Sequence, residues 1–100
     1  MIEELNDKVS EMCQLFYEAQ DMLKEEGIEL ITGAIRPVFY PQNGELYEVH
    51  VLKGIKRLAE LIGGELFHPM DITGKRDYIL AVKSGDVLYY TCVNEDGSVD

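Results

Sequence analysis

Two histidines and two cysteines are the residues of this chain best suited to catalysis or metal binding. Cys13 and Cys92 form no CxxC pair and lie in apolar segments, so we expect buried free thiols. A disulfide between them would require the N-terminal helix to cross the last strand. His50 and His68 alternate with apolar residues, and a metal site with Glu48 would need their two strands to be adjacent. We therefore predict no metal site and no cofactor.

Phosphate binding and nucleophilic catalysis find little support in the other motifs. Gly74-Lys75-Arg76 combines backbone donors with two cations, but it lacks the full phosphate-loop pattern, so a solvated turn is expected. The serines (Ser10, Ser84 and Ser98) lie in a predicted helix, a turn and a tail, with no readable base. No catalytic residue is predicted. Enzyme activity would need a folded pocket that concentrates histidines or carboxylates.

The aromatic content is high, with six tyrosines and three phenylalanines, most of them on predicted strands. Aromatic side chains on strands usually fill the core or form cross-strand pairs. If they gather instead on a sheet face that no helix covers, they would mark an interface. Together with two apolar residues that flank the N-terminal helix, the interface candidates are Leu15, Met22, Tyr40, Tyr47, Tyr78, Tyr89 and Tyr90.

The N-terminal segment gives the clearest structural pattern. Seven apolar residues are spaced alternately by three and four positions, a heptad pattern that predicts one amphipathic helix over residues 1–26. Gly27 suits the end of such a helix. The helix would be about 37 Å long and would span the whole domain. We define the apolar stripe as Ile2, Leu5, Val9, Met12, Phe16, Ala19 and Leu23.

Burial of the larger stripe residues is worth roughly 1.5–3 kcal/mol each, so the stripe must find a partner surface. One arrangement lays the helix across the sheet of its own domain. The other pairs the stripe with another subunit. Both can hold if the body covers only one end of the helix.

Most of the net charge lies on the opposite side of this helix. Of a net charge of −10, residues 1–29 carry −7, from nine acidic and two basic side chains. This acidity argues against direct binding to nucleic acid or anionic lipid, and a basic protein surface is its electrostatic complement. The alternative is an acidic face that is merely solvated. The predicted acidic face comprises Glu4, Asp7, Glu11, Glu18, Asp21 and Glu25.

The remaining residues predict a β-rich body. A strand over 28–35 resumes at 38–40, and Pro37 between them indicates an edge strand or a bulge. Asn43-Gly44 predicts a hairpin turn into a strand over 46–52. Residues 55–62 fit a short helix that ends at Gly63-Gly64. Further strands are predicted at 65–70, 78–83 and 87–93 (the last central, because both its faces are apolar), with a loop at 71–77 and a frayed acidic tail at 94–100.

This order, α-β-β-α-β-β-β, predicts a single α+β domain over residues 1–100. The long and the short helix would pack on one face of a mainly antiparallel five-stranded sheet. The order resembles that of roadblock and other profilin-like domains, from which it differs in its short second helix and in lacking their closing helix. No apolar stretch reaches the roughly 18 residues of a membrane span, and no signal-peptide pattern is present, so we expect a cytoplasmic protein.

Three functions are compatible with these patterns. The first is a small acidic cytoplasmic protein-interaction or regulatory module that acts as a homodimer and has no enzymatic activity. The second is an acidic inhibitor that mimics nucleic acid and binds a basic protein surface. The third is a small-ligand-binding protein or enzyme with an aromatic-lined pocket.

Overall fold

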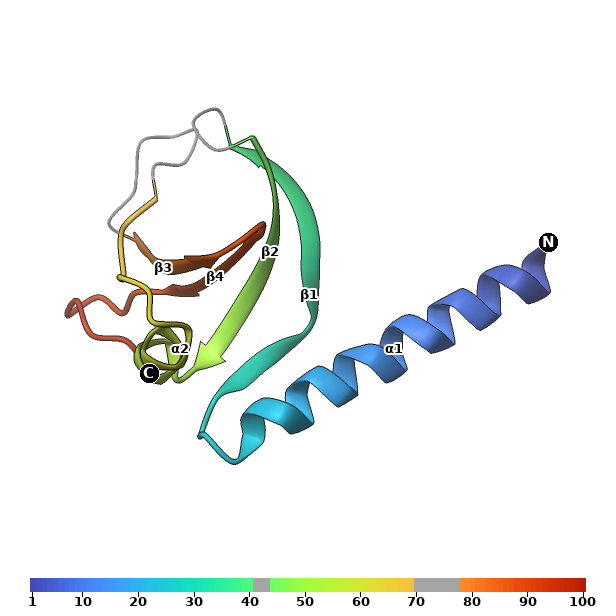
Figure 1. The fold of residues 1–100 in the computed structure, drawn as a ribbon, viewed down its shortest axis with the longest axis horizontal. Coiled ribbons are helices and arrows are strands. Elements are labelled where there is room, and N and C mark those ends of the chain that lie inside the picture. The colour runs from blue at the N-terminus through green and yellow to red at the C-terminus, as the bar shows by residue number, and fades with distance from the viewer. Residues whose placement is uncertain (41–43, 70–77) are drawn as a thin grey trace.

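The computed structural model describes residues 1–40, 44–69 and 78–100 of the chain. Figure 1 shows a long helix that projects from a small β-rich body. The predicted α+β class, with a long N-terminal helix and a short second helix, is confirmed. The elements are α1 (Ile2–Lys24), β1 (Glu29–Tyr40), β2 (Gly44–Lys53), α2 (Ile55–Ile62), β3 (Ile79–Ser84) and β4 (Val87–Cys92).

The sheet is mixed, so the prediction of a mainly antiparallel sheet is wrong. Its four strands lie in the order β1-β2-β4-β3, with antiparallel β1–β2 and β3–β4 hairpins and a parallel β2–β4 pair. This order places β4 in the middle, as its apolar sequence predicts, because both of its edges are then hydrogen-bonded and both faces packed.

The strand predicted at residues 65–70 is reduced to one β-bridge. Phe67 and Ala81 exchange two backbone hydrogen bonds, of 2.9 and 2.8 Å, and so add a fifth, one-residue segment beside β3. The predicted order of strands is therefore not matched. Gly64 precedes this segment, and a Cβ built there would lie 2.8 Å from the Val82 side chain, so the chain passes close to β3 as it leaves α2.

Strand β1 lies at the edge of the sheet, as Pro37 predicts. Leu30 pairs with Val51, but the next paired residue, Ile35, faces Val49, so β1 contains an irregular insertion within its first half. The predicted turn at 41–43 and the predicted loop at 71–77, with its Gly74-Lys75-Arg76 sequence, lie outside the described residues.

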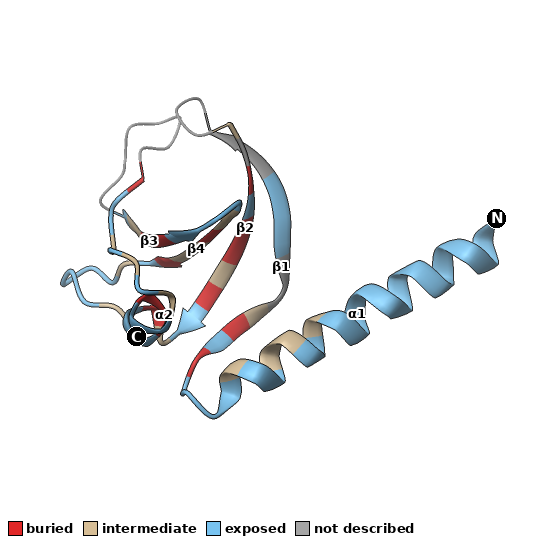
Figure 2. Cartoon of the chain, viewed as in Figure 1, coloured by how far each residue is buried: buried red, intermediate tan, exposed pale blue. Residues whose placement is uncertain are grey.

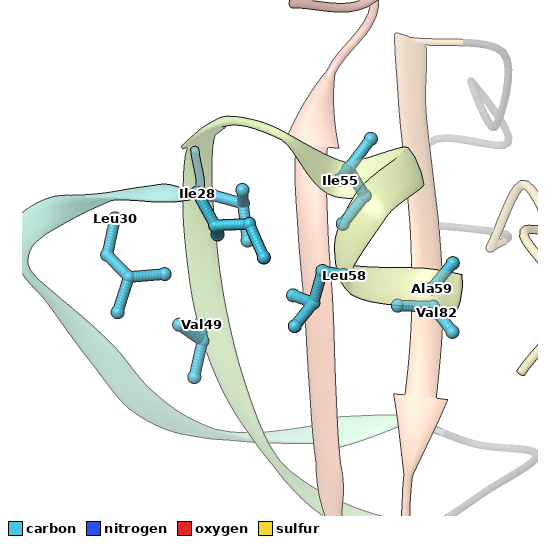
Figure 3. Close-up of a cluster of buried hydrophobic side chains, with 8 residues drawn as sticks. Ile28, Leu30, Val49, Ile55, Leu58, Ala59 and Val82 are labelled. Carbon is cyan, nitrogen blue, oxygen red and sulfur yellow. The ribbon is translucent and has the colours of Figure 1, made fainter. Parts of the chain in front are cut away.

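The main core forms between α2 and one face of the sheet. Figure 3 shows Ile55, Leu58 and Ala59 of α2 directed at strand residues such as Val49 and Val82. Ile28, from the turn after α1, is fully buried in the same cluster. Each fully buried aliphatic side chain of this kind contributes roughly 1.5–3 kcal/mol. The β-rich body is thus stabilised by a helix of only two turns.

Helix α1 does not lie across the sheet, which corrects the prediction that both helices pack on one face. None of its residues is buried, and only residues near its C-terminal end are partly covered (Figure 2). Phe16 and Leu23 of the apolar stripe pack against the main core. The helix therefore extends the molecule, whose principal dimensions are 45 × 34 × 25 Å.

The C-terminal residues 94–100, where the sequence predicts fraying, fold back onto the body. The Gly54 amide donates a 2.9 Å hydrogen bond to the Asp100 carbonyl. Val99 packs against the main core, and the Ser98 amide donates to the Asp96 carboxylate at 2.9 Å. The tail therefore covers the beginning of α2.

Gly54 gives the first testable prediction, because it has a φ of +92° and little space around it. A Cβ there would lie 2.9 Å from the Gly27 carbonyl oxygen and 3.0 Å from the Ile28 Cα atom. We expect Gly54→Ala to lower the free energy of unfolding by at least about 3 kcal/mol, because it adds backbone overlap to the strain of a positive φ. Urea denaturation followed by circular dichroism measures the loss.

Gly97→Ala is the matched control. Gly97 also has a positive φ, of +86°, but no atom would lie within 4 Å of the added Cβ. The control should cost about 1 kcal/mol, from the conformation alone. Equal losses for the two variants would contradict the importance of the close approach at Gly54.

Candidate functional site

The first candidate site is α1, and its direction is set by one side-chain amide. Gln20 donates from Nε2 to the Ile28 carbonyl at 3.0 Å, and its Oε1 accepts from the Leu30 amide at 2.6 Å. These two backbone groups lie at the start of the edge strand β1, where a neighbouring strand would otherwise pair with them. The Gln20 amide therefore takes the place of a strand and fixes the last turns of α1 to the sheet edge.

An ion pair between the end of α1 and α2 adds a second contact. The Arg57 guanidinium contacts Glu26 Oε2 at 2.8 Å from Nη2 and at 2.9 Å from Nε. Arg57 also contacts Glu60 at 3.0 Å, and hydrogen bonds to both carboxylates raise the pKa of Arg57 above its ordinary value. Because all three groups are solvent-exposed, this contact orients the helices more than it stabilises them.

The rest of the apolar stripe is uncovered. Ile2 is 64% exposed, Leu5 55%, Val9 51% and Met12 68%. The flanking candidates Leu15 and Met22 are 57% and 80% exposed. Isolated exposed apolar residues are common, but a continuous row of them along a projecting helix is the usual sign of an interaction surface.

The predicted acidic face is solvent-exposed at all six positions. Lys8 reaches Glu11 at 4.0 Å, an exposed contact of little energetic weight. Glu3 and Glu4 lie in the first helical turn, where the helix dipole favours negative charge. The exposed positions are Glu4, Asp7, Glu11, Glu18, Asp21 and Glu25.

The structure does not bring the candidate tyrosines together on one face. Tyr89 packs against the main core, whereas Tyr90 packs against a smaller cluster of Leu46, Ala81 and Leu88, as alternation along β4 requires. Tyr47 lies within β2 and Tyr78 directly before β3, and both are exposed. Tyr40 is the last residue of β1, and its side chain lies outside the part of the chain that the structure describes.

A second group of side chains, which sequence reasoning missed, lies on the sheet face opposite α2. His50 of β2 stacks on Tyr90 of β4, with ring centroids 4.6 Å apart and an interplanar angle of 19°. The Cys92 Sγ atom lies 3.7 Å from His50 Nε2. Beside them, the buried Glu48 carboxylate pairs with Arg36 Nε at 3.0 Å. The parallel β2–β4 register, with His50 opposite Tyr90, creates this group.

The environment shifts the titration of two of these groups. Burial lowers the pKa of His50 below its ordinary value of 6.5; the nearby Glu48 carboxylate opposes this shift and the Arg36 guanidinium adds to it. Burial, followed by the Glu48 carboxylate, raises the pKa of Tyr90. At neutral pH the imidazole is therefore uncharged and the phenol is protonated.

The cysteines and histidines differ in part from expectation. Cys13 and Cys92 are both free and both exposed, so the prediction of buried thiols is wrong. His68 Nδ1 lies 2.7 Å from the Ile79 carbonyl, which makes it a hydrogen-bonded histidine as expected. Within the described residues, no three potential ligands gather into a metal site, and His50, Glu48 and His68 do not form one.

Comparisons with protein families, with curated proteins and with solved structures find no match to this chain. Over residues 1–40, 44–69 and 78–100, no helix combines the length and the apolar character that crossing a membrane requires. The two sites themselves are therefore the basis for assigning a function.

The role of Gln20 is tested by Gln20→Leu, which keeps the size of the side chain but removes both hydrogen bonds. We expect the free energy of unfolding to fall by about 1–3 kcal/mol, because the Ile28 carbonyl and the Leu30 amide lose their partner. Hydrogen exchange should show lost protection at the Leu30 amide. Gln14→Leu, the same substitution at an exposed position of α1, should change neither the free energy of unfolding nor the protection of the Leu30 amide by more than about 0.5 kcal/mol. Similar losses in both variants would exclude the proposed attachment.

The lowered pKa of His50 predicts a dependence of stability on pH. Because the unfolded chain binds a proton more readily at this position, the stability that neutral His50 contributes is present above about pH 6.5 and lost as pH falls through its lower folded pKa. The free energy of unfolding should therefore decrease less between pH 7.5 and pH 5.0 for His50→Phe than for the native chain, as measured by denaturation at the two pH values. An equal decrease would contradict the assigned shift.

Proposed function

We propose that this chain is a protein-interaction module that pairs with a second copy of itself through the exposed apolar stripe of α1. The observation that carries the proposal is the unbroken helix that leaves the body with the stripe uncovered from Ile2 to Met12. A helix of this kind gains its stability in water mainly from the packing of its apolar face, so the free stretch favours a partner.

The charge distribution suits a second copy. In the heptad pattern with Ile2 and Leu5 in the central positions, the flanking positions along the free stretch are occupied by Asn6, Lys8, Cys13 and Leu15, none of which is acidic. The carboxylates occupy the outer positions, as in Glu3, Glu4, Asp7 and Glu11. Two such helices can face each other without bringing their carboxylates together, so the acidity of α1 does not oppose pairing.

The size of the surface also agrees with pairing. The exposed side chains of Ile2, Leu5, Val9, Met12 and Leu15 each present on the order of 100 Å², so two facing copies would bury roughly 1,000 Å², the lower limit of a specific interface. The C-terminal end of the stripe is already used by Phe16 and Leu23 within the same chain. The proposed dimer therefore has a weak to moderate affinity, in the micromolar range.

The second candidate function is binding to a basic protein surface through the acidic face. The observation that favours it is that all six carboxylates are exposed along one projecting helix. Such binding would weaken steeply with salt, whereas pairing through apolar side chains would not. In either case nucleic acid is not proposed as a direct ligand. The two free, exposed thiols suit a reducing compartment, and we propose the cytoplasm.

The dimer is tested by two neighbouring substitutions that add the same charge on opposite sides of α1. Val9→Glu places a carboxylate in the apolar stripe, and Ser10→Glu places one on the outer side. Sedimentation at 1–200 µM measures the fraction of dimer. We expect the native chain and Ser10→Glu to form dimers in this range. Val9→Glu should remain a monomer up to a concentration at least about tenfold higher.

A native chain that stays monomeric over this range would overturn the dimer. So would a Val9→Glu variant that dimerises as well as Ser10→Glu. Repeating the measurement in 0.05 M and 0.5 M salt tests whether the self-association is apolar, because association through charged groups would weaken strongly as the salt concentration rises.

A further inference from the structure

The contact between Cys92 and His50 has the parts of a reactive thiol. Cys92 is exposed at the end of β4, and its Sγ atom lies 3.7 Å from Nε2 of His50. Nε2 can accept a hydrogen bond from the thiol in the tautomer that carries its proton on Nδ1. A thiol, a base within hydrogen-bonding distance and access from solvent are the three requirements of a nucleophilic cysteine.

The base is held in place rather than free to rotate. The His50 ring stacks on Tyr90, and the parallel register of β2 and β4 places the two residues opposite each other. The Glu48 side chain on the same face of β2 is buried and paired with Arg36 of β1. The stack on Tyr90 and the approach of Cys92 orient the imidazole edge toward the thiol.

We propose that Cys92 is a thiol-modification site, with His50 as its base, and that it reacts with small disulfides. His50 Nε2 accepts the proton of the Cys92 thiol, and the resulting thiolate attacks one sulfur of the disulfide. The disulfide bond breaks, a new sulfur–sulfur bond joins Cys92 to one half, and the other half leaves as a thiolate that takes the proton from His50. Cys92 is oxidised, the leaving sulfur is reduced, and no other oxidant is needed.

The charged groups around His50 support this role. The groups that face it are Glu48 on its own strand, Arg36 on β1, and Tyr90 and Cys92 on β4. Burial, as the largest effect, keeps the imidazole neutral at pH 7, so it is available as a proton acceptor. The raised pKa of Tyr90 leaves its hydroxyl protonated, so it adds no negative charge beside the thiolate.

Cys13 is a reference thiol within the same molecule. It is exposed on α1, in a stretch of the helix that the body does not cover. Its reactivity should be that of an ordinary exposed thiol with no neighbouring base. Because Cys13 flanks the stripe through which we propose pairing, the two rates are compared at a concentration at which the chain is a monomer, so that a difference reports the environment of Cys92.

The experiment treats the full chain with oxidised glutathione at pH 7 and follows each cysteine by peptide mass spectrometry. We expect Cys92 to form its mixed disulfide at least about tenfold faster than Cys13. His50→Phe keeps a ring on Tyr90 but removes the base, and should bring the Cys92 rate to within about threefold of the Cys13 rate. In the native chain the ratio of the Cys92 rate to the Cys13 rate should be largest at pH 6.5 and fall towards pH 8.5, because reaction assisted by neutral His50 does not grow with pH whereas reaction of a free thiolate does.

Equal rates for Cys92 and Cys13 in the native chain would overturn the proposal, as would a His50→Phe variant with an unchanged rate ratio. Circular dichroism checks that the variant is folded. If it is not, the native rate ratio and pH profile decide the question, because both are measured without any substitution. Cys92→Ser should abolish the fast reaction and leave that of Cys13.

Discussion

The close approach of two backbone segments at Gly54 is the constraint on which this structure depends. The chain turns from β2 into α2 directly against Gly27 and Ile28, with no space for a side chain at the corner. This contact brings the fully buried Ile28 into the main core beside Ile55. The same corner receives the C-terminal carbonyl of Asp100. The end of α1, the start of α2 and the end of the chain are therefore joined through one residue that must be glycine.

From this corner the two helices have opposite roles. Helix α2 is short, but its Ile55, Leu58 and Ala59 are buried against the sheet and hold the body together. Helix α1 is nearly three times as long, yet among the described residues its contacts with the body come chiefly from Phe16, Leu23 and the Gln20 amide. Most of its apolar surface is not needed for folding. Surface that the fold leaves uncovered is what makes α1 the candidate for interaction.

The two faces of the sheet also differ in kind. The face toward α2 is aliphatic, and its contacts are those of an ordinary core. The opposite face combines an ion pair between buried Glu48 and exposed Arg36, a stacked histidine and tyrosine, and an exposed thiol. A charge pair with one buried partner is weak evidence for stability, because desolvation of that partner offsets the attraction. Its position next to His50 instead gives this face a defined electrostatic environment.

The amino-acid sequence by itself determined those features that depend on neighbours along the chain. Alternate spacing by three and four residues predicted α1, Gly63-Gly64 marked the end of α2, and Pro37 placed β1 at an edge. Each follows from local geometry, in which the period of apolar residues or the backbone freedom of one residue decides the outcome.

Only the tertiary structure decided which surfaces meet. The pairing of β2 with β4 joins His50 to Cys92 across 42 positions of sequence, and alternation along each strand is equally compatible with other partners. Likewise, the apolar stripe of α1 is the same whether the sheet covers it or not. The direction of helix α1 follows from the turn at Gly27 and the hydrogen bonds of Gln20. These are contacts between segments, and they leave no periodic pattern in the sequence.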